Sequence, residues 1–443
     1  MRTKCIFLAI VTGIIFSQAQ EPQWVALPNA PVGGKIDDLF FINPDTGWAF
    51  RNSSSPSVAT VYKTTNGGLS WTGTVVNPGG ERPTLRSIRF TNPLNGWIGS
   101  LSSPYMWNTT DGGATWNPVS NFPDGPTGIC GMFSTDSLNI FGVGAYSPTR
   151  TPYFVKTTNG GESWTMRNMS DVAGALVDIY FFSPDTGYVV GASVDGADLN
   201  TKKALVLRTT DGGFSWTKVY EGMQQGQLCW KIHFPTSTLG YVSIEPFPTM
   251  QLNLPRYLKT TNGGLAWEQQ SFPQGSYALE MQGLQFLSNG QRGWAGGFRS
   301  QAYETTDGGT TWNPSFGANL NRFRMFGDTL GYASGQTIYK FTKEPITSVE
   351  TYPTTPTVIS LDQNYPNPFN PNTTIEFLLN EITHVSLKIL DALGREVATL
   401  FEQELDQGIY RKHWDATGFP SGTYFYRLVT PQFTETRKMV LVK

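Results

Sequence analysis

The residues of this chain that could perform chemistry alternate with apolar positions in short, repeated apolar-x-aromatic strings such as Ile88-Arg-Phe90 and Ile179-Tyr-Phe181. In a β-strand, residues two apart share a face, so the polar members of these strings should project together toward one central channel. They are Asp38, Arg89, Asp178, Lys231, His233, Gln285, Arg322 and Arg324. Mixed charge of this kind could bind a polar ligand. A hydrated lining whose charges pair with one another is the favoured interpretation.

Catalysis would require a more specific arrangement of side chains. Glycoside hydrolysis needs two carboxylates flanking the scissile bond, and the lining offers Asp38 and Asp178, from repeats that we expect on opposite sides of the channel. No Gly-x-Ser-x-Gly, His-Glu-x-x-His or Cys-x-x-Cys motif occurs, and the chain has 3 His. Asp195 and Asp198 could hold a metal, but a solvated loop is the favoured interpretation. We therefore expect no catalytic residue, metal or cofactor, and keep a secreted glycoside hydrolase as the alternative.

A string that occurs six times, here called the box, indicates which elements would position these residues. One copy is Thr209-Thr-Asp-Gly-Gly-Phe-Ser-Trp216. Its first threonine falls at positions 64, 109, 157, 209, 260 and 305, and such a near-constant period is typical of repeat architectures. We expect the Asp or Asn to bond turn amides, the glycines to adopt positive φ, and the Trp to fill the space between sheets. These structural residues are Asn66, Trp71, Asp111, Trp116, Asn159, Trp164, Asp211, Trp216, Asn262, Trp267, Asp307 and Trp312.

Each repeat reads as four short strands, which predicts the blade of an all-β propeller. There are seven apolar-x-aromatic halves but six boxes. The seventh unit ends at Thr337–Thr342, and Gln23–Leu27 looks like a final strand with nothing before it. We therefore predict a seven-bladed propeller closed by its own N-terminal strand, which would remove two exposed sheet edges.

These repeats resemble the Asp-box (BNR) repeat of sialidases and sortilin-type receptors. The full unit, from Gln23 to about Lys343, is most similar to propellers of the photosystem II assembly/stability factor-like family. The resemblance implies the fold but not one activity. The sialidase arginine motif before the first box is not matched, since Gln20–Thr64 contains only Arg51. Binding loops are expected in the variable connections Ala145–Phe154, Ser193–Lys203 and Ile244–Tyr257.

Composition limits the partners and the compartment. A formal net charge of −2 gives no reason to expect nucleic acid. Residues 1–19 read as a signal peptide, with a basic start, a short apolar run and small residues before the cut. No other segment is long and apolar enough for a transmembrane helix. We expect a monomer in which Cys130 and Cys229 are buried thiols without a disulfide.

A Pro/Thr-rich linker, 344–361, precedes a second domain, 362–443, whose strands and turns predict a small Ig-like β-sandwich. Its motifs resemble the C-terminal sorting domain of proteins exported by the type IX secretion system. The residues that carry the resemblance include Asn364, Pro366, Asn367, Pro368, Phe369, Gly394, Gly422 and Tyr424. The resemblance implies the outer-membrane secretion machinery as a partner and a secreted or outer-surface location. With a propeller at 20–343, the expected function is a non-catalytic module for a protein or glycan ligand.

Overall fold

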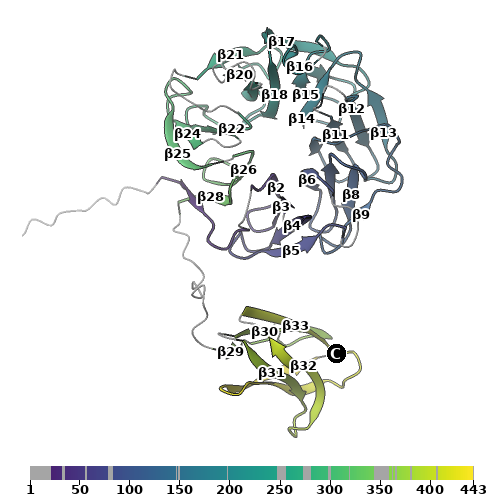
Figure 1. Ribbon diagram of the computed structural model, residues 1–443, viewed down its shortest axis with the longest axis vertical. Helices are drawn as coiled ribbons and strands as arrows, with labels where there is room; N and C mark the ends of the chain where they lie inside the picture. The colour runs from purple at the N-terminus through teal and green to yellow at the C-terminus, as the bar shows by residue number, and fades with distance from the viewer. Residues whose placement is uncertain are drawn as a thin grey trace, which may run out of the picture. The chain divides into compact units, whose positions relative to one another are not determined.

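The chain folds into β-sheets that form two compact units, Met1–Ile346 and Thr347–Lys443 (Figure 1). This computed structural model describes residues 21–31, 35–54, 57–77, 83–145, 147, 150–196, 198–246, 256–272, 281–297, 301–318, 320–343, 359–361, 363–364, 367–379, 382–405 and 408–442. The predicted signal peptide, nearly all of the linker, and Pro366 lie outside them. Within these ranges, no helix is long and apolar enough to cross a membrane.

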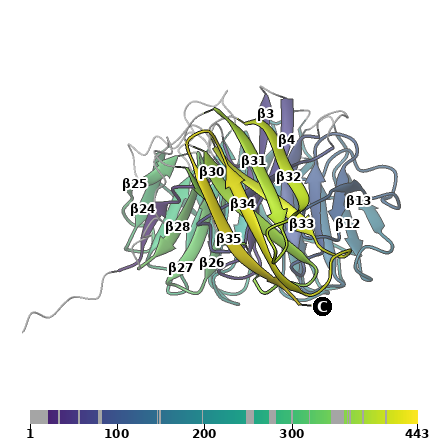
Figure 2. The same cartoon turned by 90° about the horizontal axis from the view of Figure 1, so that it is seen from below.

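The first unit contains seven four-stranded antiparallel sheets, which confirms the predicted seven blades. Blade one comprises β2 (Asp38–Phe41), β3 (Gly47–Ser54), β4 (Ser57–Thr64) and β5 (Thr72–Val75). Blade two comprises β6 (Leu85–Phe90), β7 (Gly96–Ser100), β8 (Met106–Thr109) and β9 (Asn117–Pro118). Blade three comprises β10 (Gly131–Ser134), β11 (Ile140–Gly144), β12 (Tyr153–Thr157) and β13 (Thr165–Asn168). β3 and β4 rise above the neighbouring strands of the propeller in Figure 2.

The remaining blades follow the same order from the centre outward. Blades four to seven comprise β14 (Ala175–Phe181), β15 (Gly187–Ala192), β16 (Lys203–Thr209) and β17 (Thr217–Gln225); β18 (Gln227–His233), β19 (Gly240–Pro246), β20 (Arg256–Thr260) and β21 (Glu268–Ser271); β22 (Gly283–Phe286), β23 (Gly293–Gly296), β24 (Gln301–Thr305) and β25 (Asn313–Ala318); and β26 (Arg322–Phe326), β27 (Leu330–Ser334) and β28 (Ile338–Thr342) with β1 (Gln23–Ala26).

The seventh sheet takes its outer strand from the beginning of the chain. β1 pairs antiparallel with β28, and Trp24 lies opposite Phe341. The indole ring also stacks on Phe316 with centroids 4.8 Å apart and meets Trp294 edge to face at 5.5 Å. The predicted pairing of the two ends of the propeller is thus present, and its register is fixed by an aromatic cluster.

Adjacent blades are joined by a repeated aromatic stack. The aromatic residue at or near the start of the second strand lies face to face with the phenylalanine that ends the first strand of the next blade. The ring centroids are 3.5 Å apart for Trp48–Phe90, 3.6 Å for Tyr332–Phe41 and 4.0 Å for Tyr241–Phe286. The box tryptophan then meets that phenylalanine edge-on, as Trp116 meets Phe90 at 5.9 Å. At these interfaces two blades therefore supply a three-ring cluster, whereas Tyr188 meets Phe234 at a tilt and Trp97 packs with Met132 of the third blade.

The boxes form closely similar hydrogen-bonded turns. In the second blade, the Thr109 hydroxyl donates to Asp111 Oδ1 over 2.7 Å and accepts from the Gly113 amide, while Asp111 accepts from Thr115. Gly112 and Gly113 have φ values of 74° and 92°, which a residue with a side chain would adopt only with strain. In the other boxes Asn or Asp makes the equivalent threonine bond.

The box turns lie against the turns between the first and second strands of the same blades. The amide of the first box glycine donates to a carbonyl of that turn in all six cases, as Gly112 does to Leu94 and Gly212 to Asp185. The two turn types therefore share one rim, here called the turn rim. Because each turn is the other's hydrogen-bond partner, neither can change length freely, which explains why both are nearly constant in the sequence.

The second unit is a sandwich of two sheets, in the orders β29-β30-β33 and β32-β31-β34-β35. Its strands are β29 (Ser360–Leu361), β30 (Asn372–Leu379), β31 (Thr383–Leu390), β32 (Glu396–Leu405), β33 (Gly408–Asp415), β34 (Gly422–Val429) and β35 (Thr434–Leu441). Phe377 and Trp414 from one sheet and Leu387 and Tyr426 from the other share one core. Sheets of three and four strands around a common core match the predicted Ig-like sandwich.

Several residues of the sorting-domain motif stabilise the sandwich. Asn367 accepts from the Val440 amide through Oδ1, and the buried Phe369 packs against Trp414. Asn364 donates its amide to the Tyr426 hydroxyl. Gly394 turns the chain between β31 and β32 with a φ of 78°. Gly422 opens β34, where the Tyr424 hydroxyl donates to the Pro420 carbonyl.

Trp24→Ala should lower the free energy of unfolding of the propeller by about 3 kcal/mol, because it empties a site lined by four aromatic rings. Urea unfolding followed by tryptophan fluorescence measures this. The adjacent Val25 is 39% exposed, so Val25→Ala is the matched control and should change stability by less than about 0.5 kcal/mol. Equal effects of the two substitutions would contradict the role given to Trp24.

Asp211→Ala should cost about 1 kcal/mol, because it removes the acceptor of the turn bonds. Asp211→Asn should be nearly neutral at pH 7, since Asn262 fills the same position in the next blade. Hydrogen bonds from Ser215 lower the pKa of Asp211 to about 2. The carboxylate's contribution is therefore present above its unfolded pKa near ~4 and is lost as the pH falls toward 2. Wild type should lose stability relative to Asp211→Asn over that interval in urea titrations, and a pH-independent difference would contradict this assignment.

Candidate functional site

The channel-facing residues predicted from the sequence occupy two layers at the centre of the propeller, around which the innermost strands are arranged (Figure 1). Strand register assigns each residue to a layer. The middle layer consists of Asp38, Ser87, Gly131, Asp178, Lys231, Gly283 and Arg322. The mouth layer, two residues further along each strand and nearer the turn rim, consists of Phe40, Arg89, Phe133, Tyr180, His233, Gln285 and Arg324. The sequence prediction had not separated these layers.

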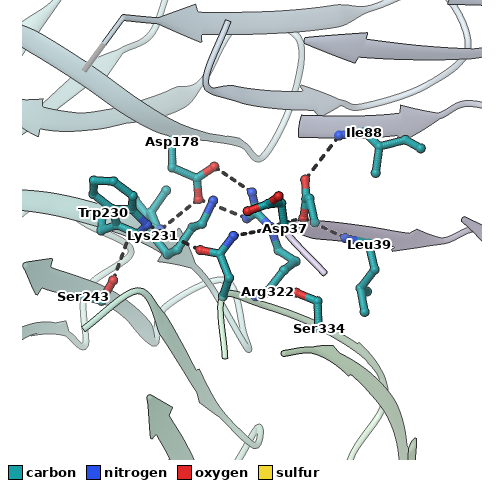
Figure 3. Close-up of polar contacts among 12 residues, drawn as sticks. Asp37, Leu39, Ile88, Asp178, Trp230, Lys231, Ser243, Arg322 and Ser334 are labelled. Atoms are coloured by element: carbon teal, nitrogen blue, oxygen red, sulfur yellow. Dashed lines mark hydrogen bonds and ion pairs between the residues drawn. The ribbon is translucent and has the colours of Figure 1, made fainter. Parts of the chain in front are cut away.

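In the middle layer, one guanidinium group binds two carboxylates. Arg322 Nε lies 3.0 Å from Asp38 Oδ1, and its two terminal nitrogens each lie 3.1 Å from an oxygen of Asp178. Both carboxylates also accept backbone amides of the following blade, Asp38 from Ile88 and Asp178 from Ile232. Figure 3 shows Asp178 and Lys231 on one side of Arg322, and Leu39 and Ile88 on the other. Arg322 thus connects blades one, four and seven across the channel.

The protonation states in this layer follow from burial and mutual charge. Burial opposes ionisation of Asp178, but Arg322, Lys231 and the hydrogen bonds together hold its pKa below the usual value. Burial, followed by repulsion from Arg322, lowers the pKa of Lys231 to about 8. Two carboxylates and two cations leave the layer nearly neutral. Asp38 and Asp178 are each about 1–3% exposed in their side chains, and neither is available to a substrate.

Asp38 and Asp178 come from blades one and four, which we expected on opposite sides of the channel, and Arg322 links them by binding both. The small residues of the layer are part of the reason. A Cβ atom on Gly131 would lie 2.7 Å from Asp178 Cα, so glycine lets the neighbouring strands approach closely. An arginine in phase with two aspartates of the repeat was the available sequence indication of this bridge.

The mouth layer has a different charge balance. The Arg89 guanidinium lies 4.7 Å from the centre of Phe40 and 4.4 Å from that of Phe133, and the Arg324 guanidinium lies 5.1 Å from Phe40. His233 accepts the Phe286 amide through Nε2, and burial lowers its pKa to about 3, so its imidazole is neutral at pH 7. Gln285 donates to the Phe286 carbonyl. The layer is thus aromatic and cationic.

A cavity of about 360 Å³ opens at the mouth layer on the turn-rim side. Its wall includes Phe133, Tyr180, His233, Gln285 and Arg324, and its edge includes turn residues such as Ser288 and Asp328. We had expected a site among the variable loops of the opposite rim. Several residues of those loops lie outside the described part of the chain, so that expectation stays a prediction.

The loop at Ser193–Lys203, considered for a metal through Asp195 and Asp198, contains a cation of its own. The buried Lys202 ammonium donates to the carbonyls of Ser193, Val194 and Gly196, each at 3.2 Å. Asp198 accepts the Asn200 and Thr201 amides instead. The loop is therefore organised around an internal lysine.

Cys130 and Cys229 are buried and form no disulfide, as predicted.

Comparison with known proteins identifies the second unit and places the first among propellers. Residues 363–443 match the family model described as the secretion system C-terminal sorting domain. Two solved structures of YCF48 each align over 73% of this chain with a TM-score of 0.53. One is described as bound to a D1 peptide, with 16% identity and 98% of its chain covered; the other is from Cyanidioschyzon merolae, with 18% identity and 100% covered.

Enzymes are also among the similar proteins. The structure of an ancestral GH74 enzyme aligns with a TM-score of 0.51 and 14% identity, over 95% of this chain and 63% of the enzyme. A Paenibacillus xyloglucanase is 35% identical over 126 residues, which is 26% of this chain but 12% of that enzyme's length. The structural likenesses establish a common fold, and that fold serves both a peptide-binding protein and an enzyme.

The fold and its centre define a seven-bladed propeller whose channel is crossed by ion pairs, followed by a small sandwich. The sandwich carries the secretion system C-terminal sorting domain. The chain is therefore a propeller protein similar in fold to YCF48, exported by type IX secretion to the cell surface or the extracellular space.

Arg322→Met should destabilise the propeller by about 3–5 kcal/mol at pH 7, because it leaves two buried carboxylates without their cation. The loss should shrink as the pH is lowered, since unpaired buried carboxylates become protonated more easily. Urea unfolding at pH 7 and pH 5 measures both effects. Arg167→Met, which breaks a more exposed ion pair with Asp171, is the control and should cost less than about 1 kcal/mol. A similar loss for both variants would rule out the central bridge.

Proposed function

We propose that the propeller is a non-catalytic binding module, presented outside the cell, whose ligand occupies the cavity at the mouth layer. The observation that carries this proposal is the separation of the two layers. The carboxylates of the middle layer are held by Arg322, whereas the cavity is lined mainly by aromatic, cationic and amide side chains, and Asp328 at its edge accepts hydrogen bonds from Ser288. A concave site with aromatic walls and a few fixed polar groups is typical of ligand binding.

The ligand class is a protein or a glycan, as the sequence predicted. We assign the propeller to 20–343 and the linker to 344–361, with residues 1–19 as the export signal. The domain at 362–443 would direct secretion through contacts with the outer-membrane machinery. The propeller would then be the exported domain, and the sandwich would be its secretion signal.

A glycoside hydrolase is the second candidate, favoured by the local 35% identity with a xyloglucanase. A separate pocket of about 230 Å³ beside Trp216 includes Asp171, Asp195 and Glu221. However, Asp171 pairs with Arg167, and Glu221 pairs with Lys203 and Lys218. Both carboxylates are thus engaged by cations of the protein itself, which argues against their use as the pair that glycoside hydrolysis needs.

The test compares the wild-type chain with Ser288→Trp, which places a large ring at the edge of the mouth cavity. We expect saturable binding to at least one member of a panel of soluble glycans and displayed peptides, and at least a tenfold loss in Ser288→Trp. Glu162→Trp, on an exposed box of the third blade, is the matched control and should bind normally. Calorimetry or biolayer interferometry gives the affinities.

The same preparations should release no reducing sugar from xyloglucan. Hydrolysis that survives Ser288→Trp and disappears in Glu221→Gln would overturn the binding proposal in favour of the hydrolase. Binding that is unaffected by Ser288→Trp would remove the ligand from the mouth cavity.

A further inference from the structure

Two cations of the mouth layer lack a carboxylate of their own. Among the described residues, no carboxylate lies within ion-pair distance of Arg89 or Arg324, although Arg322 binds two carboxylates one layer away. Arg89 donates through Nε to the Ser134 hydroxyl at 3.3 Å, and Arg324 donates through Nε to the Phe41 carbonyl at 3.0 Å. Both acceptors are neutral. The guanidinium groups are thus held in place without being neutralised.

Their surroundings make this arrangement unfavourable in the absence of a ligand. Both guanidinium groups lie over Phe40, and burial followed by repulsion from Arg324 lowers the pKa of Arg89 to about 9. Like charges in a partly dry site repel strongly because little water screens them. An anion beside Arg324 would offset that repulsion with charge-assisted hydrogen bonds, for which the planar guanidinium fork suits a carboxylate.

We propose that the mouth cavity binds a carboxylate at Arg324, which lines it, with Arg89 adding its charge from behind Phe133 of the cavity wall, and that this carboxylate belongs to an acidic segment of a protein partner. The proposal rests on the proposed function, since it names the ligand chemistry of the same cavity. Tyr180 would complete the site, because it lines the same cavity and its ring lies 4.8 Å from that of Phe133, centroid to centroid.

The surface around the cavity favours a protein over a glycan as the source of the carboxylate. The turn rim exposes large apolar side chains, with Phe214 85%, Leu265 59% and Phe182 37% exposed. Tyr180, Phe182 and Phe234 are in mutual ring contact, so this apolar surface continues into the cavity wall. Apolar side chains around a charged anchor match the composition of protein–protein interfaces.

The experiment measures binding of two pentapeptides to the full chain by calorimetry at 50 mM and 300 mM salt. Ac-Gly-Phe-Glu-Phe-Gly-amide should bind at least tenfold more tightly than the Gln counterpart, and the preference should weaken at high salt. Arg324→Met and Arg89→Met should each remove the preference for the Glu peptide over the Gln peptide. Arg167→Met, distant in sequence and on the third blade's outer strand, should behave as wild type.

Circular dichroism checks the fold of each variant. If either fails to fold, the wild-type comparison of Glu with Gln and its salt dependence still decides the matter. Equal affinity for the two peptides overturns the proposal. Binding of methyl glucuronide, with no binding of the Glu peptide, overturns the protein partner and assigns an acidic glycan. If the protein binds only neutral ligands, and Ser288→Trp blocks that binding, the proposed function holds and the carboxylate site is wrong.

Discussion

The propeller depends on the stack of aromatic rings between one blade and the next. At several interfaces an aromatic ring of one sheet lies flat on a phenylalanine of its neighbour, and in most blades the box tryptophan meets that phenylalanine edge-on. A four-stranded sheet cannot bury both faces alone, so each blade is stable only between neighbours. Hydrogen bonds such as that from Trp48 Nε1 to the Gly112 carbonyl fix the angle of contact. The seventh blade obtains its version from Trp24, contributed by the other end of the chain.

This packing also determines what the centre can be. Seven first strands converge at a fixed spacing, so charged residues at one strand position must face each other across the channel. The middle layer resolves that crowding with a nearly neutral network around Arg322, whereas the mouth layer keeps its positive charge beside a cavity. Charge compensation in one layer and its absence in the next distinguishes a structural layer from a binding layer. The two layers differ in charge balance although the same seven strands supply both.

Much of the architecture could be predicted because the residues that form the turns and the contacts between blades recur within each repeat of the sequence. The period of the boxes predicted the number of blades. The last unit lacks a box and the strand at Trp24 has no unit before it, which together predicted that this strand pairs with the last unit. Alternation along the first strands led to the prediction that side chains such as Asp38, Lys231 and Arg324 face the channel. Their partners could not be assigned, because an alternating pattern defines which face a residue occupies but not which distant residue it meets.

The sequence by itself determined the fold class, the number of blades, the turns on one rim and the export domain, since each depends on neighbours along the chain or on a repeat of fixed length. The tertiary structure alone decided that Arg322 would bridge two aspartates from different blades and that Arg89 and Arg324 would share Phe40 without a carboxylate. Those contacts join residues of different blades, from Arg89 and Phe40 in neighbouring blades to Arg322 and Asp38, which lie 284 positions apart, and their existence depends on how the ring of blades brings the first strands together in space.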